Sequence, residues 1–439
     1  MNTDEPNVEL SIVDQFDPET TAMLQAFYSR SHVRIKERLD SLGTDQKEIK
    51  ESLKKYYVGY GHKSIGQCAS TTIFIEGVSI LAAKAFQDSP LYNGQETSTR
   101  FIDFSKATIH NPLNDTTNIQ KNWLDFYANS LSKVIEHVAK QRSLDLTDVT
   151  HYSAAKARAF DILRAFVPAG ASTQLSWFTS FTHASDRLIQ LSFHPLKEVG
   201  DVSVALSGYL QTQYPYAFSG FDSTLKKFSS YYYDNALGLN YLVMSQDEEC
   251  FWPEYKIQKF EQSAVRTTDG MDRIQGVSVP RHFQYQGRIQ VQYKLDYGSF
   301  RDIQRHRACV QMMPVLTTRL GFNEWYLNAL PDDLHDEAIE LILNQEELIN
   351  TLYANNPDTD VQYYIPLGYN VTGLLDMDYP EAVYIAELRT SKTVHPTLRK
   401  LAISIAKDVE PYGFVNTFCD YSEDDFTIRR GQQDIIKTL

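Results

Sequence analysis

Two short polar runs have residue types that could do chemistry. The first is Arg305-His306-Arg307, which places two permanent cations and a titratable imidazole on consecutive residues. Arginine forks bind phosphates and carboxylates and stack on flat rings, so this run is a candidate anion or cofactor site. Three successive helical positions spread over about 200° of the helix surface, so all three side chains face one ligand only where a helix ends. The alternative is a solvated basic helix end, neutralised by Asp296 or Asp302.

The second run is Gln95-Glu96-Thr97-Ser98-Thr99-Arg100. In an extended segment Glu96, Ser98 and Arg100 alternate, so their side chains share one face. An acceptor, a hydroxyl and a guanidinium on one face suit an amide-bearing ring and its phosphate. The alternative is an exposed polar loop.

Two isolated residues are further candidates. Arg389 could bind a phosphate, and the alternative is a surface salt bridge with Glu387 or Glu381. His62 lies between a glycine and a predicted helix start, and the alternative there is a role in capping the helix.

Two stretches of the chain match each other at an offset of about 200 to 220 residues, which predicts an internal duplication. Five collinear matches carry this hypothesis: Val167-Pro168-Ala169-Gly170 with Ile365-Pro366-Leu367-Gly368, His194-Pro195 with His395-Pro396, Pro215-Tyr216-Ala217-Phe218 with Pro411-Tyr412-Gly413-Phe414, Gln87 with Arg305, and Arg100 with Arg319. Where the second copy reads Arg-His-Arg, the first reads Gln87-Asp88-Ser89, and the second copy has largely lost the 95–100 run. Each copy keeps what the other lacks, so we expect active sites built from two unequal parts.

Periodicity predicts a helix-rich α+β fold. Strands are expected at 71–76 and 288–295, where apolar residues alternate, each followed by a short helix, at 78–86 and 297–304. Further helices are expected at 17–39, 46–57, 118–139, 154–166, 331–353 and 396–408. The predicted domains are two copies, residues 1–230 and 231–439.

Bulk properties narrow the function class. The chain has 439 residues and a net charge of −14, which argues against a nucleic-acid or anionic-membrane partner. Its four cysteines show no metal-site spacing, and Cys309, between apolar neighbours, is expected to be a buried thiol rather than a nucleophile. The sequence has no P-loop, no Gly-x-Gly-x-x-Gly after a strand, no secretory signal and no long apolar run. We expect a cytoplasmic protein without a metal site.

The motifs together resemble those of the flavin-dependent thymidylate synthase (ThyX) family. Arg305-His306-Arg307 matches that family's Arg-His-Arg, and residues 95–101 are similar to its Asn-Glu-x-Ser-x-Arg-Tyr. Gly61-His62-Lys63-Ser64, followed by the strand at 71–76, resembles its Gly-His-x-Ser segment. The chain is therefore predicted to be a tandem fusion of two such units, a pseudo-dimer in one chain.

The resemblance implies an enzyme that methylates dUMP to dTMP, with FAD as cofactor and NADPH and methylenetetrahydrofolate as co-substrates. It assigns FAD to Arg305, His306, Arg307, His62 and Ser64. It assigns the nucleotide to Gln95, Glu96, Ser98, Arg100 and Arg389, with Arg305, Ser98 and Arg389 as catalytic residues. Family members are homotetramers, so a homodimer of fused pairs would imitate them.

The chain departs from the family pattern around the expected phosphate site. Thr372 and Gln174 stand where arginines are expected, His194 lies near the first-copy position of Arg389, and Asp302 replaces a glutamine. These departures leave two alternatives open. One is a flavoenzyme acting on another pyrimidine nucleotide or a nucleoside, and the other is a non-catalytic protein that binds nucleotide or flavin.

Overall fold

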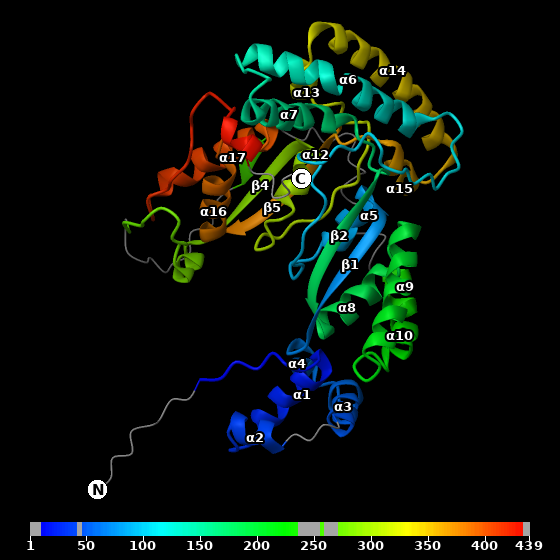
Figure 1. Cartoon of the computed structure of the whole chain (residues 1–439), viewed down its shortest axis with the longest axis vertical. Coiled ribbons are helices and arrows are strands. Elements are labelled where there is room, and N and C mark those ends of the chain that lie inside the picture. The colour runs from blue at the N-terminus through cyan, green and yellow to red at the C-terminus, as the bar shows by residue number, and fades with distance from the viewer. Residues whose placement is uncertain (1–9, 42–45, 236–254, 259–270, 433–439) are drawn as a thin grey trace. The chain divides into compact units, whose positions relative to one another are not determined.

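The computed structural model describes residues 10–41, 46–235, 255–258 and 271–432 (Figure 1). The chain divides into two compact units, with unit 1 formed by residues 1–74 and 176–237 and unit 2 by residues 75–175 and 238–439. Strands β1 (Ser70–Ser79) and β2 (Ser172–Ser180) pair in a two-stranded sheet, and each runs from one unit into the other. The copy boundary at 230/231 stays a prediction.

Unit 1 is helical apart from its portions of β1 and β2. Asp17 caps the first helix, because its carboxylate accepts from the main-chain N–H of Glu19 and Thr20 at 3.1 and 3.3 Å. The elements are α1 (Pro18–Tyr28), α2 (Ile35–Ser41), α3 (Lys47–Leu53), the π-helix η1 (Lys54–Gly59), α4 (Lys63–Gln67), α8 (Phe181–Leu191), α9 (Lys197–Gln213) and α10 (Phe221–Asn235).

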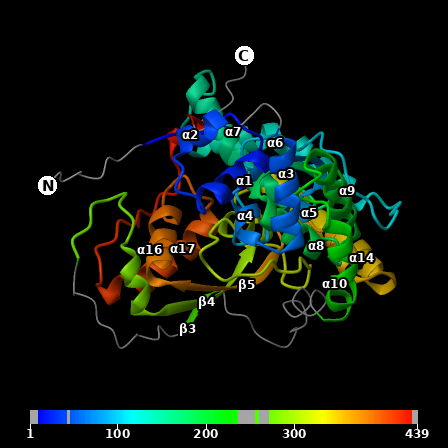
Figure 2. The same ribbon diagram turned by 90° about the horizontal axis from the view of Figure 1, so that it is seen from below.

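Unit 2 is built on a three-stranded antiparallel sheet in the order β3-β4-β5 (Figure 2). Strand β3 spans Tyr255–Gln258, β4 Arg288–Asp296 and β5 Asn370–Asp378. Ile289, Val291, Tyr293 and Leu295 alternate along β4 and are all buried, as the period of two predicts. Each long strand leads directly into a helix, which brings the start of that helix to the end of the sheet.

Helices of unit 2 cover the sheet and pack on one another. α16 (Tyr379–Arg389) and α17 (Pro396–Val409) pack together beside β4, and α6 (Ile119–Gln141) packs on α7 (Val149–Leu163) and on α14 (Asp332–Asn355) (Figures 1 and 2). The remaining elements are α5 (Ile80–Gln87), α12 (Tyr297–Ile303), α13 (Glu324–Asn328), α15 (Asp358–Val361) and the 3₁₀ turns η2 (Arg164–Phe166), η3 (Arg281–Gln286), η4 (Gln362–Tyr364), η5 (Glu410–Tyr412) and η6 (Ile428–Gln432).

The segments 167–170 and 365–368, which match in sequence, are hydrogen-bonded to each other. Their bonds are reciprocal: replacing each residue of a bond by its counterpart in the other segment gives another bond of the same set. A two-fold contact between identical subunits has this property. In the first pair, Ala169 N donates to Ile365 O and Leu367 N to Val167 O, both at 2.9 Å. In the second pair, Gly170 N donates to Tyr363 O at 2.8 Å and Gly368 N to Ala165 O at 2.9 Å. Both segments lead into a strand and then a helix, β2–α8 and β5–α16.

The helix-rich α+β class is confirmed, and most predicted elements exist with ends shifted by a few residues. The single helix predicted over 17–39 is wrong: α1 ends at Tyr28 and α2 begins at Ile35. Between them the Ser31 hydroxyl accepts from Val33 N at 3.1 Å, a local bond that competes with helix continuation. The helix predicted over 46–57 changes into a π-helix at Lys54.

Candidate active site

Glu96 lies at the centre of a buried ionic group in unit 2. Its carboxylate is 2.5 Å from Lys84 Nζ and 2.6 Å from Arg301 Nη2, and it accepts from Gln87 Nε2 at 2.9 Å. Lys84 and Gln87 come from α5 and Arg301 from α12, so the 95–100 run meets the helix that precedes the Arg-His-Arg run. Thr97 N donates to Gln174 O at 3.0 Å, which fixes the Glu96 segment against β2.

The side chains of this group are almost fully shielded from solvent, with 1% of Lys84, 2% of Glu96 and 8% of Arg301 exposed. Burial alone would raise the pKa of Glu96, but the adjacent Arg301 and Lys84 outweigh burial and lower that pKa to about 2. Glu96 is therefore ionised at neutral pH, although it lies inside the protein.

The Arg-His-Arg run begins just after α12 ends at Ile303, so the three side chains are free to diverge. Arg305 is exposed, whereas His306 is buried. The Arg307 guanidinium lies 4.9 Å from the centre of the buried Tyr92 ring. These positions agree with the expectation that the three side chains of the run do not face one ligand from a regular helix.

His306 joins the run to α16. Its Nδ1 is 3.1 Å from Glu381 Oε1, and its Nε2 accepts from Arg389 Nε at 2.8 Å. Burial lowers the pKa of His306, and so does the positive charge of Arg389, while Glu381 opposes the shift. The neutral imidazole with its proton on Nδ1 satisfies both contacts, so His306 orients Arg389.

Several polar atoms around the run are buried without a hydrogen-bond partner among the described residues. They are Arg301 Nε, Arg307 Nε and Gln304 Oε1. Lys84, Arg301, Arg305 and Arg307 supply four cations here, and Glu96 supplies one carboxylate. We call these residues, with Tyr92, Gln87 and Gln304, the motif cluster. Orphaned buried donors and excess positive charge are what an anionic ligand would satisfy.

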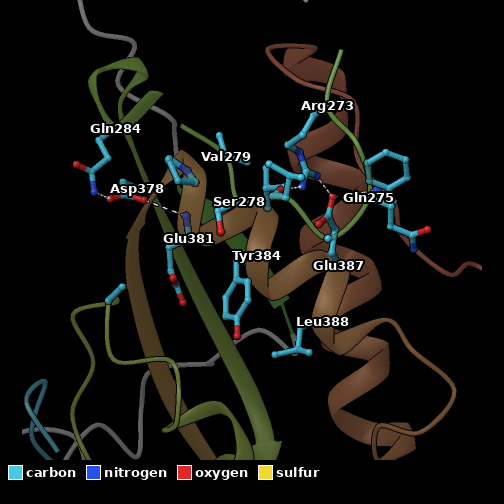
Figure 3. Close-up of a pocket in the computed structure, with 16 residues that line it drawn as sticks. Arg273, Gln275, Ser278, Val279, Gln284, Asp378, Glu381, Tyr384, Glu387 and Leu388 are labelled. Atoms are coloured by element: carbon cyan, nitrogen blue, oxygen red, sulfur yellow. Dashed lines mark hydrogen bonds and ion pairs between the residues drawn. The ribbon is translucent and has the colours of Figure 1, made fainter. Parts of the chain in front are cut away.

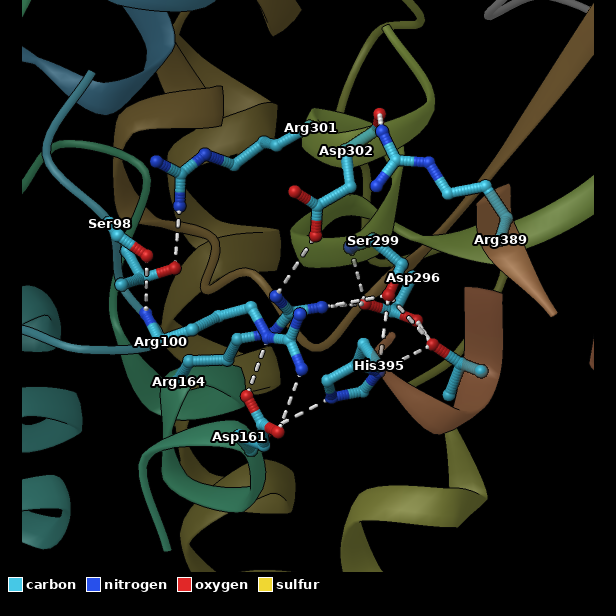
Figure 4. A network of polar contacts seen from close by, with 12 residues as sticks. Ser98, Arg100, Asp161, Arg164, Asp296, Ser299, Arg301, Asp302, Arg389 and His395 are labelled. Atoms are coloured by element: carbon cyan, nitrogen blue, oxygen red, sulfur yellow. Dashed lines mark hydrogen bonds and ion pairs between the residues drawn. The ribbon is translucent and has the colours of Figure 1, made fainter. Parts of the chain in front are cut away.

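A second group of arginines in unit 2 is paired with aspartates (Figure 4). Arg100 Nε and Nη2 donate to the two oxygens of Asp161 at 2.6 and 2.9 Å. Arg164 lies 3.5 Å from Asp296 and 3.7 Å from Asp302. We call the aspartate–arginine network the set Arg100, Asp161, Arg164, Asp296, Asp302, Arg389 and Arg430.

Two aspartates of this network, Asp161 and Asp302, are ionised. Burial alone would raise the pKa of Asp161, but Arg100 and Arg430 hold it well below its usual range. The pKa of Asp302 is likewise lowered, against the effect of burial, by Arg100, Arg164 and Arg389. Arg389 Nη2 also donates to the Asp302 carbonyl at 2.8 Å. The alternative salt bridges proposed for Arg389 are not formed, since Glu387 pairs with Arg273 and Glu381 with His306.

The remaining predicted site residues are placed as follows. Ser98 is half-buried and its hydroxyl accepts from Arg100 N at 3.3 Å, while Gln95 is exposed. His62 and Ser64 lie in unit 1, both exposed, with the His62 ring 6.5 Å from Tyr56 and 6.2 Å from Tyr60. Their predicted contact with a cofactor stays a prediction.

Three positions that depart from the family pattern, Thr372, Gln174 and His194, lie in different parts of the structure. Thr372 is buried on β5 opposite Lys294, and Gln174 is exposed on β2. His194, in unit 1, accepts from Leu196 N at 3.1 Å, and burial lowers its pKa to about 3. None of the three side chains supplies the cation that the family motif expects.

A cavity of about 550 Å³ is lined in part by Glu381, the partner of His306 (Figure 3). Asp378, Glu381 and Tyr384 of β5 and α16 line it, and its one arginine, Arg273, is paired with Glu387. The cavity is large enough for a small molecule, but its unpaired charge is negative. An anionic group is therefore expected at the motif cluster rather than here.

Other predictions about the chemistry can be compared with the described residues. Cys309 is buried as predicted, and burial raises the pKa of its thiol, which makes it a poor nucleophile. Among the residues that the structure describes, no group of three or more His, Cys, Asp or Glu side chains is arranged to hold a metal ion. The helices within the described ranges include none that is long and apolar enough to cross a membrane.

Sequence reasoning missed Lys84, Tyr92, Asp161, Arg164 and Arg301. A weak signal existed for some of them. Lys84 is the single charge in the apolar run Ile80–Phe86, and Asp161 and Arg164 interrupt an apolar run before the Val-Pro-Ala-Gly motif. A lone charge in a run that is otherwise predicted to be buried needs a partner, but nothing in the sequence says which.

Comparison with known proteins bears on the predicted family. Residues 11–194 match the family model described as thymidylate synthase complementing protein. The resemblance to this family is confirmed. A UPF0159 protein of Chlamydia muridarum is 23% identical over 431 residues, covering 83% of this chain and 80% of that protein. One from Thermoplasma acidophilum is 22% identical over 437 residues, covering 83% and 87%.

Similarity to solved structures is weaker. Thymidylate synthase X from Helicobacter pylori, solved with FAD and dUMP, shares 15% identity and a TM-score of 0.29, covering 46% of this chain and 94% of that one. A second structure of the Helicobacter pylori enzyme, also with FAD and dUMP, shares 16% identity at the same TM-score.

Proposed function

We propose that this chain is a flavin-dependent, thymidylate synthase-like enzyme that methylates a uracil ring reductively at C5. Conversion of dUMP to dTMP, with methylenetetrahydrofolate as carbon donor and NADPH as reductant, is the reaction that the resemblance implies. The observation that carries the proposal is the meeting of the two motif halves. Glu96 of the first copy contacts Arg301, one helical turn before Arg305 of the second copy, at 2.6 Å.

The motif cluster suits FAD, because the dinucleotide carries a diphosphate and a flat ring. Arg305 is exposed and available to a phosphate, and the buried Arg307 Nε has no partner among the described residues. His306 acts through Arg389, which it orients. His62 and Ser64 are assigned to the cofactor by their motif alone. When bound, the flavin supplies the hydride.

The second motif is assigned to the pyrimidine. Ser98 offers a half-buried hydroxyl and Gln95 an exposed amide, while Glu96, Arg100 and Arg389 complete the set carried over from the family. A guanidinium near the ring, from Arg305 or Arg389, would stabilise negative charge that develops on the ring oxygens. No cysteine is needed in this scheme, which agrees with the raised pKa of Cys309.

The reciprocal bonds between segments 167–170 and 365–368 support the proposed tandem origin. They join the two copies as two identical subunits would be joined. We propose that one chain corresponds to a dimer of the family and that a homodimer corresponds to its homotetramer. Sedimentation equilibrium tests this, with twice the chain mass as the expected value.

The test of function is product formation by the purified, FAD-loaded protein given methylenetetrahydrofolate, NADPH and a uracil substrate. Formation of the 5-methyl product, lost in Arg305→Ala, supports the proposal. Arg288→Ala is the matched control, because Arg288 is an exposed arginine of β4 that pairs with Asp376. A protein that retains FAD but forms no product in any combination of substrates would be a binding protein and not an enzyme.

A further inference from the structure

Arg100 and Arg389, the two arginines assigned to the nucleotide, already have partners within the protein. Arg100 directs Nε and Nη2 at the two oxygens of Asp161, at 2.6 and 2.9 Å, and its Nη2 also donates to Thr393 O at 3.2 Å. This two-pronged geometry is the one with which an arginine grips a phosphate. Only 13% of the Arg100 side chain and 3% of that of Asp161 are exposed.

Arg389 is committed in the same way. Its Nε donates to His306 Nε2 and its Nη2 to the Asp302 carbonyl, both at 2.8 Å. The Asp302 carboxylate lies 3.7 Å from Arg164 and takes the place of the family's neutral glutamine. A phosphate brought to Arg100 and Arg389 would therefore meet two ionised carboxylates, Asp161 and Asp302 (Figure 4).

The arginines outside the aspartate–arginine network are assigned to the flavin and not to the nucleotide. Arg305 and Arg307 form no ion pair within 4 Å with a carboxylate among the described residues, but they belong to the motif cluster and are assigned to the diphosphate of the flavin. Thr372 and Gln174 supply no further cation at the positions where the family motif has arginines. The donors of Arg100 that Asp161 holds, and those of Arg389 that His306 and the Asp302 carbonyl hold, are therefore not replaced by an arginine at either position.

We infer that this site takes a pyrimidine nucleoside without a phosphate. Asp161 holds Arg100, while His306 and the Asp302 carbonyl hold Arg389, and the Asp302 carboxylate adds negative charge beside both arginines. The inference rests on the proposed function, since it concerns the substrate of that same site. Asp302 is then a specificity-determining residue. Its negative charge disfavours binding of a phosphate dianion, because like charges at close range repel strongly in a partly buried site. The same charge has little effect on the binding of an uncharged sugar hydroxyl.

The test is calorimetric titration of the protein with 2′-deoxyuridine and with dUMP. For the wild-type chain, deoxyuridine is expected to bind at least about tenfold more tightly than dUMP, a difference of about 1.4 kcal/mol. In Asp302→Asn, affinity for dUMP should rise about tenfold, and affinity for deoxyuridine should change less than about threefold. Asp333→Asn, which removes an exposed carboxylate of α14 paired with Lys133, should leave both affinities unchanged.

Asp302→Asn should fold, because Arg164 keeps its contacts with Asp296 and Ser299. Tighter binding of dUMP than of deoxyuridine by the wild-type chain would overturn the inference, and so would binding of neither. Retention of FAD is measured beforehand on the same protein, and the titration is run on whichever form is isolated. Loss of FAD therefore counts against the proposed function, whereas a preference for dUMP counts against this inference alone.

Discussion

The motif cluster and the aspartate–arginine network are both rich in arginine, yet they differ in how far their donors are used. In the network, Arg100, Arg164 and Arg389 each make two or more polar contacts within the protein. In the motif cluster, Arg305 is exposed, and Arg301 and Arg307 each bury an Nε that has no partner among the described residues. The network has four arginines against three aspartates, and its Arg430 also buries an Nε without a partner among the described residues. The motif cluster has four cations against one carboxylate, so its excess of positive charge is larger.

This difference separates arginines that the protein's own groups largely hold from arginines that remain available to a ligand. Uncompensated buried charge is costly, so the group with the larger excess of positive charge is expected to receive an anionic ligand. A group whose charges are matched contributes to the fold, and removing one member leaves the others uncompensated. The comparison therefore predicts large stability effects in the network and mainly binding effects in the motif cluster.

The largest effect is expected from Asp161→Ala. It leaves Arg100 and Arg430 without their carboxylate in a buried site and should lower the free energy of unfolding by about 3–5 kcal/mol. Urea unfolding measures this. The control is Asp186→Ala in unit 1, whose exposed pair with Lys63 should cost less than about 1 kcal/mol. Equal effects of the two substitutions would show that the network is not structural.

Acid should weaken the protein through Glu96. Its pKa in the folded state is about 2, below its value of about 4.5 in the unfolded chain. The stability that it contributes is therefore complete above pH 4.5 and is lost as the pH falls towards 2, by about 3 kcal/mol in all. Unfolding free energies between pH 5 and pH 2 should fall more steeply in the wild type than in Glu96→Gln. Parallel curves would contradict the buried ion pairs.

Arg307→Ala should act on flavin binding. It removes a guanidinium that stacks on Tyr92 and carries an orphaned donor, so FAD affinity should fall by about ten- to a hundredfold. The free energy of unfolding without FAD should change by less than about 1 kcal/mol. Fluorescence titration with FAD gives the affinity. If Arg307→Ala instead unfolds the protein and causes no specific loss of flavin binding, Arg307 stabilises the fold and does not bind flavin.

The smallest effect is expected from His62→Ala. His62 is exposed in unit 1 and is linked to the cofactor only by its motif, so FAD affinity should fall about threefold. The same fluorescence titration measures it, and His32→Ala, another histidine of unit 1, is the control. A loss as large as that of Arg307→Ala would make His62 a principal flavin ligand.

The sequence was sufficient for the motifs and for part of the elements, whereas β5 and α16, which carry Asp378, Glu381 and Arg389, were not predicted. Alternation along 288–295 predicted β4, because it depends on neighbours within a few residues. The end of α12 just before Arg305 was foreseen as a condition for the Arg-His-Arg run to share a ligand. Local rules of this kind can be read directly from one chain.

What could not be foreseen were the partners of the buried charges. Glu96 and Arg301 are 205 residues apart, and Arg100 and Asp161 are 61 apart. Such pairs depend on how α5, α7 and α12 pack, which one sequence without homologues does not define. Arg389 was expected to hold a phosphate or a neighbouring glutamate, and instead it holds His306 and the Asp302 carbonyl.

Flavin retention decides whether the motif cluster is a flavin site built from both copies. The visible absorption spectrum would be recorded after excess FAD is added to the purified protein and removed by desalting. Flavin absorption bands should persist in the wild type and in Arg288→Ala but disappear in Arg307→Ala. A colourless wild-type protein, or equal retention by all three, would contradict it.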